Sequence, residues 1–119
     1  MTVEVVDHPV IAAADGLLAA DGTAAGDLEI LVLIFTDFRK AFARNPVGEN
    51  EEIAAALLGR NPKGLRFLRP GHRALDAEGR LCDRFGTPLF FHAISSQRME
   101  IRSAGPDREH GTSDDLTWP

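Results

Sequence analysis

The residues whose types and spacing are best suited to chemistry lie near the end of the 119-residue chain. Asp107, Asp114 and Asp115 fall close together in sequence, and Gly105 and Gly111 favour tight bends of the backbone between them. Carboxylates held close together repel each other unless a cation lies between them. Calcium takes about six to eight oxygen ligands from carboxylates, carbonyls and water, and it accepts irregular geometry. The pattern therefore indicates a candidate calcium loop.

The expected ligands come from both side chains and the main chain. The three aspartates would supply carboxylates, and the carbonyls of Ala104 and Thr112 would add neutral oxygens. The spacing does not match an EF-hand. Counting from Asp107, the sixth residue is Thr112 where that motif needs glycine, and the twelfth is Trp118 where it needs glutamate. From spacing alone, an acidic and solvated loop without metal is the stronger interpretation.

A long helix is predicted before this loop, over residues 27–44. Its apolar residues recur at spacings of three and four, as they do on one face of a helix. They are Leu28, Leu31, Ile34, Phe35, Phe38 and Phe42. We expect Asp27 to cap the start, and Pro46 to end the helix because it disfavours helical geometry at Asn45. A shorter helix is predicted over 51–58, with Asn50 as its cap.

A β-hairpin is predicted after the helices. Leu89–Ile94 is rich in β-forming residues, Met99–Arg102 alternates apolar and charged residues, and the short link 95–97 suits an antiparallel turn. Helices followed by strands indicate an α+β fold. We expect the N-terminal long helix to pack on a small antiparallel β-sheet, with the acidic loop at the C-terminus. Residues 1–26 are expected to form a leader, either disordered or with a weak helical turn, and residues 27–119 to form the domain.

Composition and the remaining motifs exclude several classes of function. The net charge is −5, which argues against a nucleic-acid partner. The four histidines are scattered, Cys82 stands alone, and neither a Gly-X-Ser-X-Gly elbow nor a phosphate-binding loop is present, so we expect no enzyme activity. No stretch approaches the ~18 apolar residues of a membrane span, so we expect no membrane insertion. The acidic start favours a cytoplasmic chain, or a periplasmic one if the true start lies upstream.

The stretch from Asp83 to Asp115 resembles the C-terminal half of type II secretion major pseudopilins. The residues that carry the resemblance are Asp83-Arg-Phe-Gly-Thr-Pro88, the following hairpin, Ser103-Ala-Gly-Pro-Asp107, and the closing pair Asp114-Asp115. The resemblance implies a calcium-binding loop with the ligands named above. It also implies a non-enzymatic structural and interaction role in protein assembly or secretion.

Protein partners are implied in the same way, either further copies of this chain or other pseudopilin-like subunits. The chain departs from the family pattern, because Arg84 and Phe85 replace the usual Pro and Trp, and the family's basic leader and apolar stem are missing. The alternative is therefore a soluble intracellular adaptor or regulatory module with the same fold and no metal.

Overall fold

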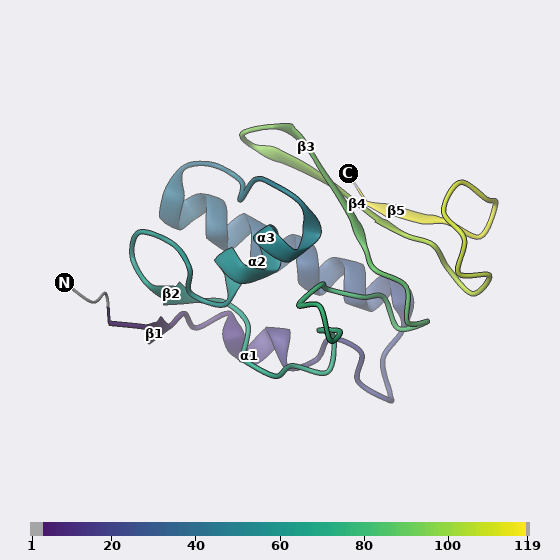
Figure 1. Ribbon diagram of the computed structural model, residues 1–119, viewed down its shortest axis with the longest axis horizontal. Coiled ribbons are helices and arrows are strands. Elements are labelled where there is room, and N and C mark those ends of the chain that lie inside the picture. The colour runs from purple at the N-terminus through teal and green to yellow at the C-terminus, as the bar shows by residue number, and fades with distance from the viewer. Residues whose placement is uncertain (1–3, 119) are drawn as a thin grey trace.

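The computed structural model describes residues 4–118. The chain forms an α+β fold, with one long helix and a small antiparallel sheet of three strands. In chain order the elements are β1 (Val6–Asp7), α1 (Ile11–Ala14), α2 (Ala24–Phe42), α3 (Asn50–Leu57), β2 (Leu65–Arg66), β3 (Phe90–Ser95), β4 (Arg98–Ser103) and β5 (Leu116–Trp118) (Figure 1). The predicted α+β class is thus confirmed. No helix within residues 4–118 has the length and apolar character needed to cross a membrane.

Helix α2 begins earlier than the sequence predicts. Thr23 is its N-cap, and the Thr23 hydroxyl accepts a hydrogen bond of 3.0 Å from the backbone N–H of Gly26. The predicted cap, Asp27, lies inside the first turns and is buried. That prediction was wrong because the Asp27 carboxylate bonds groups outside its own helix. The helix ends at Phe42, and its C-cap Ala43 adopts a left-handed conformation with φ of 64°.

The short helix α3 also starts differently from the prediction. Glu49 is its N-cap and forms a reciprocal capping box with Glu52. Asn50, the predicted cap, instead uses its side chain to link two later segments. Its amide nitrogen donates to the carbonyls of Leu81 and Leu89, at 2.9 and 2.7 Å, and its amide oxygen accepts from the N–H of Leu81. Asn50 therefore links the segment 81–89 to α3 by hydrogen bonds.

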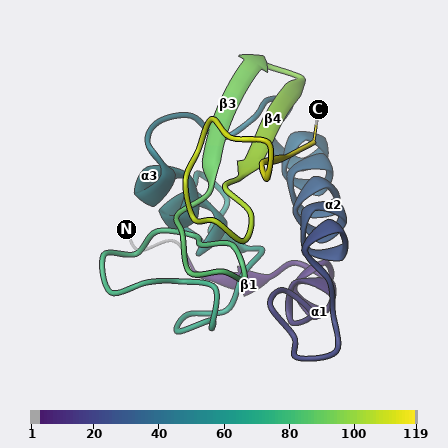
Figure 2. The same cartoon turned by 90° about the vertical axis from the view of Figure 1, so that its right-hand side faces the viewer.

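The antiparallel sheet has the strand order β3-β4-β5. The hairpin β3–β4 appears close to the predicted residues, while β5 lies where the sequence predicted only loop. Met99 and Ile101 of β4 point into the core, and the ring of Phe91 on β3 meets Phe35 of α2 edge-on at 5.4 Å between centroids. Figure 2 shows α3 and α2 on either side of the view, with the β3–β4 hairpin rising between them.

The N-terminal segment contributes to the same core. Val10, Ala14 and Leu17 are buried in the main hydrophobic cluster, α1 contacts α2, and β1 pairs in parallel with β2. The expectation of a separate leader over 1–26 differs from this arrangement across residues 4–26, and residues 1–3 lie outside the described part. The physical reason is the spacing of four and three between the buried residues, which gives one apolar face that α2 covers.

Candidate functional site

The candidate site is the loop of residues 104–115, which projects beyond the sheet at one end of the molecule (Figure 1). Its two ends are held together by the sheet, because Ser103 of β4 pairs with Leu116 of β5. Gly105 and Asp114 then touch directly across the base of the loop. Gly105 has φ of 76°, and a Cβ at this position would collide with the carbonyl oxygen of Asp114. The loop is therefore closed at its base, and only glycine fits at position 105.

Inside the loop, one hydroxyl lies between two of the predicted carboxylates. The Thr112 Oγ1 is 2.5 Å from Oδ2 of Asp107 and 3.5 Å from Oδ1 of Asp115. The other oxygen of Asp107 accepts from the N–H of Glu109 at 2.9 Å, and the other oxygen of Asp115 accepts from the N–H of Gly111 at 2.7 Å. The N–H groups of Gly111 and Thr112 lower the pKa of Asp115 below its usual value, since hydrogen bonds favour the charged carboxylate.

The five predicted ligands do not all meet. The structure brings together Asp107, Thr112 and Asp115, with Thr112 contributing its hydroxyl, whereas the prediction used its carbonyl. Asp114 is exposed, and Ala104 is fully buried beneath the loop. Within residues 4–118, no three acidic, histidine or cysteine side chains are grouped closely enough to hold a metal ion.

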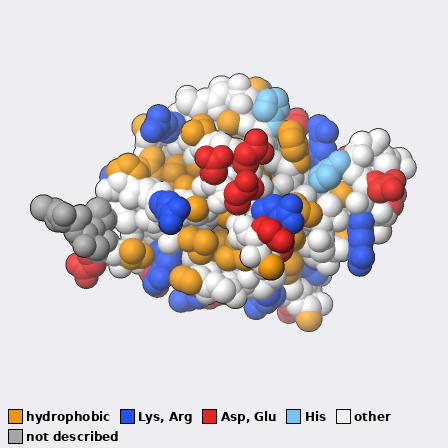
Figure 3. Space-filling view, viewed as in Figure 1, with side chains coloured by type: hydrophobic (Ala, Val, Ile, Leu, Met, Phe, Trp, Pro, Cys, Tyr) orange, Lys and Arg blue, Asp and Glu red, His pale blue; other side chains and the backbone are white. Residues whose placement is uncertain are grey.

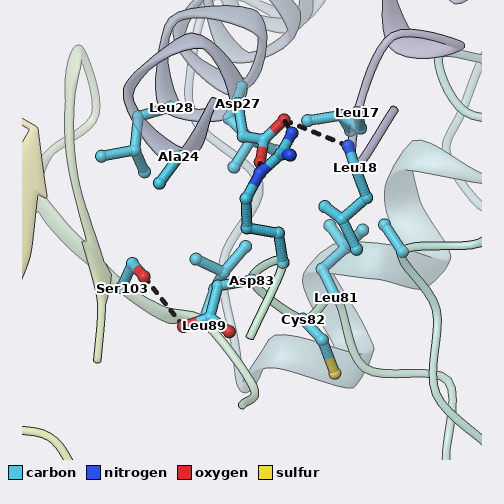
Figure 4. Close-up of a pocket in the computed structure, with 13 residues that line it drawn as sticks. Leu17, Leu18, Ala24, Asp27, Leu28, Leu81, Cys82, Asp83, Leu89 and Ser103 are labelled. Carbon is cyan, nitrogen blue, oxygen red and sulfur yellow. Dashed lines mark hydrogen bonds and ion pairs between the residues drawn. The ribbon is translucent and has the colours of Figure 1, made fainter. Parts of the chain in front are cut away.

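A chain of buried polar groups fixes the base of the loop. Asp83 is only 4% exposed, and its Oδ1 accepts from the N–H groups of Phe85 and Thr87, each at 3.0 Å. Its Oδ2 accepts from the hydroxyl of buried Ser103 at 2.8 Å (Figure 4). That hydroxyl accepts in turn from the N–H of Gly105 at 3.2 Å. The turn at 83–88 and the start of the loop, which are separate motifs in the sequence, are thus in direct contact.

A second polar pair, Asp27 and Arg84, lines one small pocket together with Asp83 and Ser103. Arg84 donates to both carboxylate oxygens of Asp27, at 2.6 and 2.9 Å, and to the carbonyls of Ala19 and Gly22. The Asp27 carboxylate also accepts from the N–H of Leu18 at 3.0 Å (Figure 4). Sequence reasoning missed this pair. The only available signal was an aspartate on the apolar face of a predicted helix, and that signal does not identify the partner.

Three residues that belong to no catalytic motif in the sequence, His72, His110 and Cys82, occupy structural positions. His72 Nε2 lies 2.8 Å from the carbonyl oxygen of Ala14, and its Nδ1 accepts from the N–H of Ala74, so Nε2 carries the proton. His110 Nε2 lies 3.1 Å from the carbonyl oxygen of Pro88. Cys82 is buried, and burial followed by the negative charge of Asp76 raises the pKa of its thiol to about 11. A thiol with this pKa is a poor nucleophile.

Comparison with known proteins found no matching protein-family model, no matching curated protein and no matching solved structure. The resemblance to the pseudopilins stays a prediction drawn from the motifs.

Proposed function

We propose that this chain is a non-enzymatic structural and interaction domain whose C-terminal loop binds Ca²⁺, in the manner of the pseudopilin heads that it resembles. In this proposal the long helix α2 supports the small sheet, and the sheet presents the acidic loop. The observation that carries the proposal is the position of the Thr112 hydroxyl between the carboxylates of Asp107 and Asp115.

The Thr112 hydroxyl cannot donate to both carboxylates at once. Thr112 has one hydroxyl proton and can donate it to only one carboxylate at a time, and the shorter distance assigns it to Asp107. Both carboxylates lie beside that one hydroxyl, so a cation placed there would interact with the negative charge of each. A calcium ion would neutralise both charges, while the neighbouring carbonyls and water would complete its oxygen shell.

The base of the loop reduces the conformational entropy that the loop would lose on closing around an ion, which supports the proposal. Gly105 holds the base of the loop against Asp114, and the Ser103 hydroxyl links that base to buried Asp83. A loop already closed at its base loses less conformational entropy when it closes around an ion. Binding would stabilise the strand that follows the loop, β5, on the edge of the sheet, and so would couple metal binding to folding.

Thermal unfolding in EDTA, in added calcium and in added magnesium tests the proposal. A ligand that binds only the folded state stabilises it by about 2.7 kcal/mol at 100 times its dissociation constant. We expect calcium to raise Tm more than magnesium does, and Asp107→Asn or Asp115→Asn to abolish the increase. Glu109→Gln is the matched control, because it removes one charge from the same loop at a side chain outside the proposed site. Equal melting in EDTA and in saturating calcium would exclude the calcium role.

A second candidate is an adaptor or regulatory module with the same fold and no metal. The observation that favours it is the hydrogen bonding of the loop itself. Both oxygens of Asp107 and both of Asp115 accept bonds from neighbouring N–H or hydroxyl groups. The loop is thereby closed without an ion. The same melting experiment separates the two candidates, since the adaptor would keep one Tm under all three conditions.

A further inference from the structure

A groove with an aromatic floor lies far from the acidic loop, at the end of α2. Its volume is about 220 Å³, and it runs between the last turns of α2, the segment 44–47 and the turn at 60–62. Phe38 and Phe42 line it, together with Val47, which is 69% exposed. Covering an exposed apolar side chain of this kind removes apolar surface from water and so stabilises a complex. The groove therefore offers apolar surface that the chain itself leaves uncovered.

A second, more open hollow continues the first. It is about 440 Å³ in volume and is lined by Val5, by Ala55 of α3 and by residues 58–60 after that helix, and Arg60 borders both hollows. Val5 is 49% exposed. Two shallow hollows joined across one side chain suit an extended chain better than a small molecule, which usually needs a deeper and more enclosed pocket.

The charge of the groove is entirely positive. Arg44 and Arg60 line it, no aspartate or glutamate does, and neither arginine forms an ion pair with a carboxylate of residues 4–118. Most arginines elsewhere on this acidic chain do form such pairs, among them Arg66, Arg69, Arg80, Arg84 and Arg102. On the face shown in Figure 3, several exposed acidic side chains gather near the centre.

We propose that this groove binds an extended acidic peptide segment of a partner protein, with an apolar side chain against Val47 and carboxylates against Arg44 and Arg60. Arginine binds carboxylates through two parallel N–H bonds, and the adjoining aromatic surface excludes water from one side of the pair. The proposal names a partner for the interaction role proposed above and rests on that role, but it does not depend on calcium.

Fluorescence anisotropy with a labelled hexapeptide, Asp-Glu-Leu-Phe-Asp-Glu, tests the proposal on the full chain. We expect saturable binding that weakens as salt is added, because exposed ion pairs are screened. Arg44→Gln and Arg60→Gln should each weaken binding by about threefold, and together by about tenfold. Val47→Ser should weaken binding without changing its salt dependence. Arg98→Gln is the control, since Arg98 is exposed, has no ion pair within residues 4–118, and lines a different hollow from the groove.

Several results would overturn this inference. They are the absence of saturable binding up to about 1 mM peptide, an equal loss with Arg98→Gln, unchanged binding when Leu and Phe of the peptide are replaced by Ala, or stronger binding of a single-stranded DNA oligonucleotide. The calcium melting experiment is read separately. Loss of peptide binding with an intact calcium shift refutes only the groove, whereas peptide binding without a calcium shift refutes only the calcium loop.

Discussion

Removing Arg84 should destabilise the fold more than removing any exposed arginine. The Asp27 and Arg84 side chains are 9% and 18% exposed, and two charged hydrogen bonds join them. Arg84→Met keeps the apolar stem but leaves the Asp27 carboxylate with the N–H of Leu18 as its one remaining partner in residues 4–118. Breaking a buried ion pair in this way costs about 3–5 kcal/mol. Because water reaches part of Arg84, we expect the lower end, about 3 kcal/mol.

Urea unfolding followed by far-ultraviolet circular dichroism measures this loss as a shift in midpoint at constant m-value. The double variant Asp27→Leu with Arg84→Met removes both charges, so it should be more stable than Arg84→Met alone. Arg98→Met, at an exposed position, should change the free energy of unfolding by less than about 0.5 kcal/mol. A loss below about 1 kcal/mol for Arg84→Met, or simple additivity in the double variant, would refute a structural role for the pair.

Three further predictions concern the loop and the buried thiol. Gly105→Ala should lower the free energy of unfolding by more than about 3 kcal/mol because its Cβ meets the Asp114 backbone, whereas Gly111→Ala, with φ of 86° and open space, should cost about 1 kcal/mol in the same urea assay. Cys82, with its pKa raised to about 11, should react with a disulfide reagent at pH 8 on the order of 100-fold more slowly in the folded chain than in urea. The pKa of Asp115 is lowered on folding, so its stabilising contribution is complete above pH 3.8 and is lost as the pH falls through the folded pKa. Carboxyl NMR should therefore give a titration midpoint below 3.8 for Asp115 in the folded chain. Asp115→Asn should make Tm depend less on pH at the acid side of a Tm–pH curve.

The sequence predicted the elements that obey a simple period. The apolar spacing of three and four identified the buried face of α2, including Leu31, Ile34 and Phe35, which are each at most 1% exposed. Alternation in Met99–Arg102 identified β4, whose Met99 and Ile101 are buried. Both signals come from residues that are neighbours on one element, so one sequence is enough to detect them.

The elements that depend on distant partners were not predictable in this way. Strand β5 has three residues and pairs with β4 only because the loop brings it back to the sheet. Aspartate is a favoured helix N-cap, yet the Asp27 carboxylate forms an ion pair with Arg84, which lies far along the chain. The apolar runs of the N-terminal segment are short because Gly16, Gly22 and Gly26 interrupt them, and the segment becomes part of the core only because α2 covers it. In each case a contact over long sequence separation overrides the local preference.

The proposed calcium loop and the proposed peptide groove can be tested independently because the fold separates them. Figure 1 shows the loop and the last turn of α2 toward opposite ends of the molecule. The bonds from Asp83 to Ser103 and from Ser103 to Gly105 hold the base of the loop whether or not an ion is present. An ion bound by Asp107 and Asp115 would therefore act mainly on the loop and on β5. Peptide affinity at the groove should then be the same in EDTA and in calcium, and a calcium-dependent affinity would indicate a coupling between the two ends that these contacts do not provide.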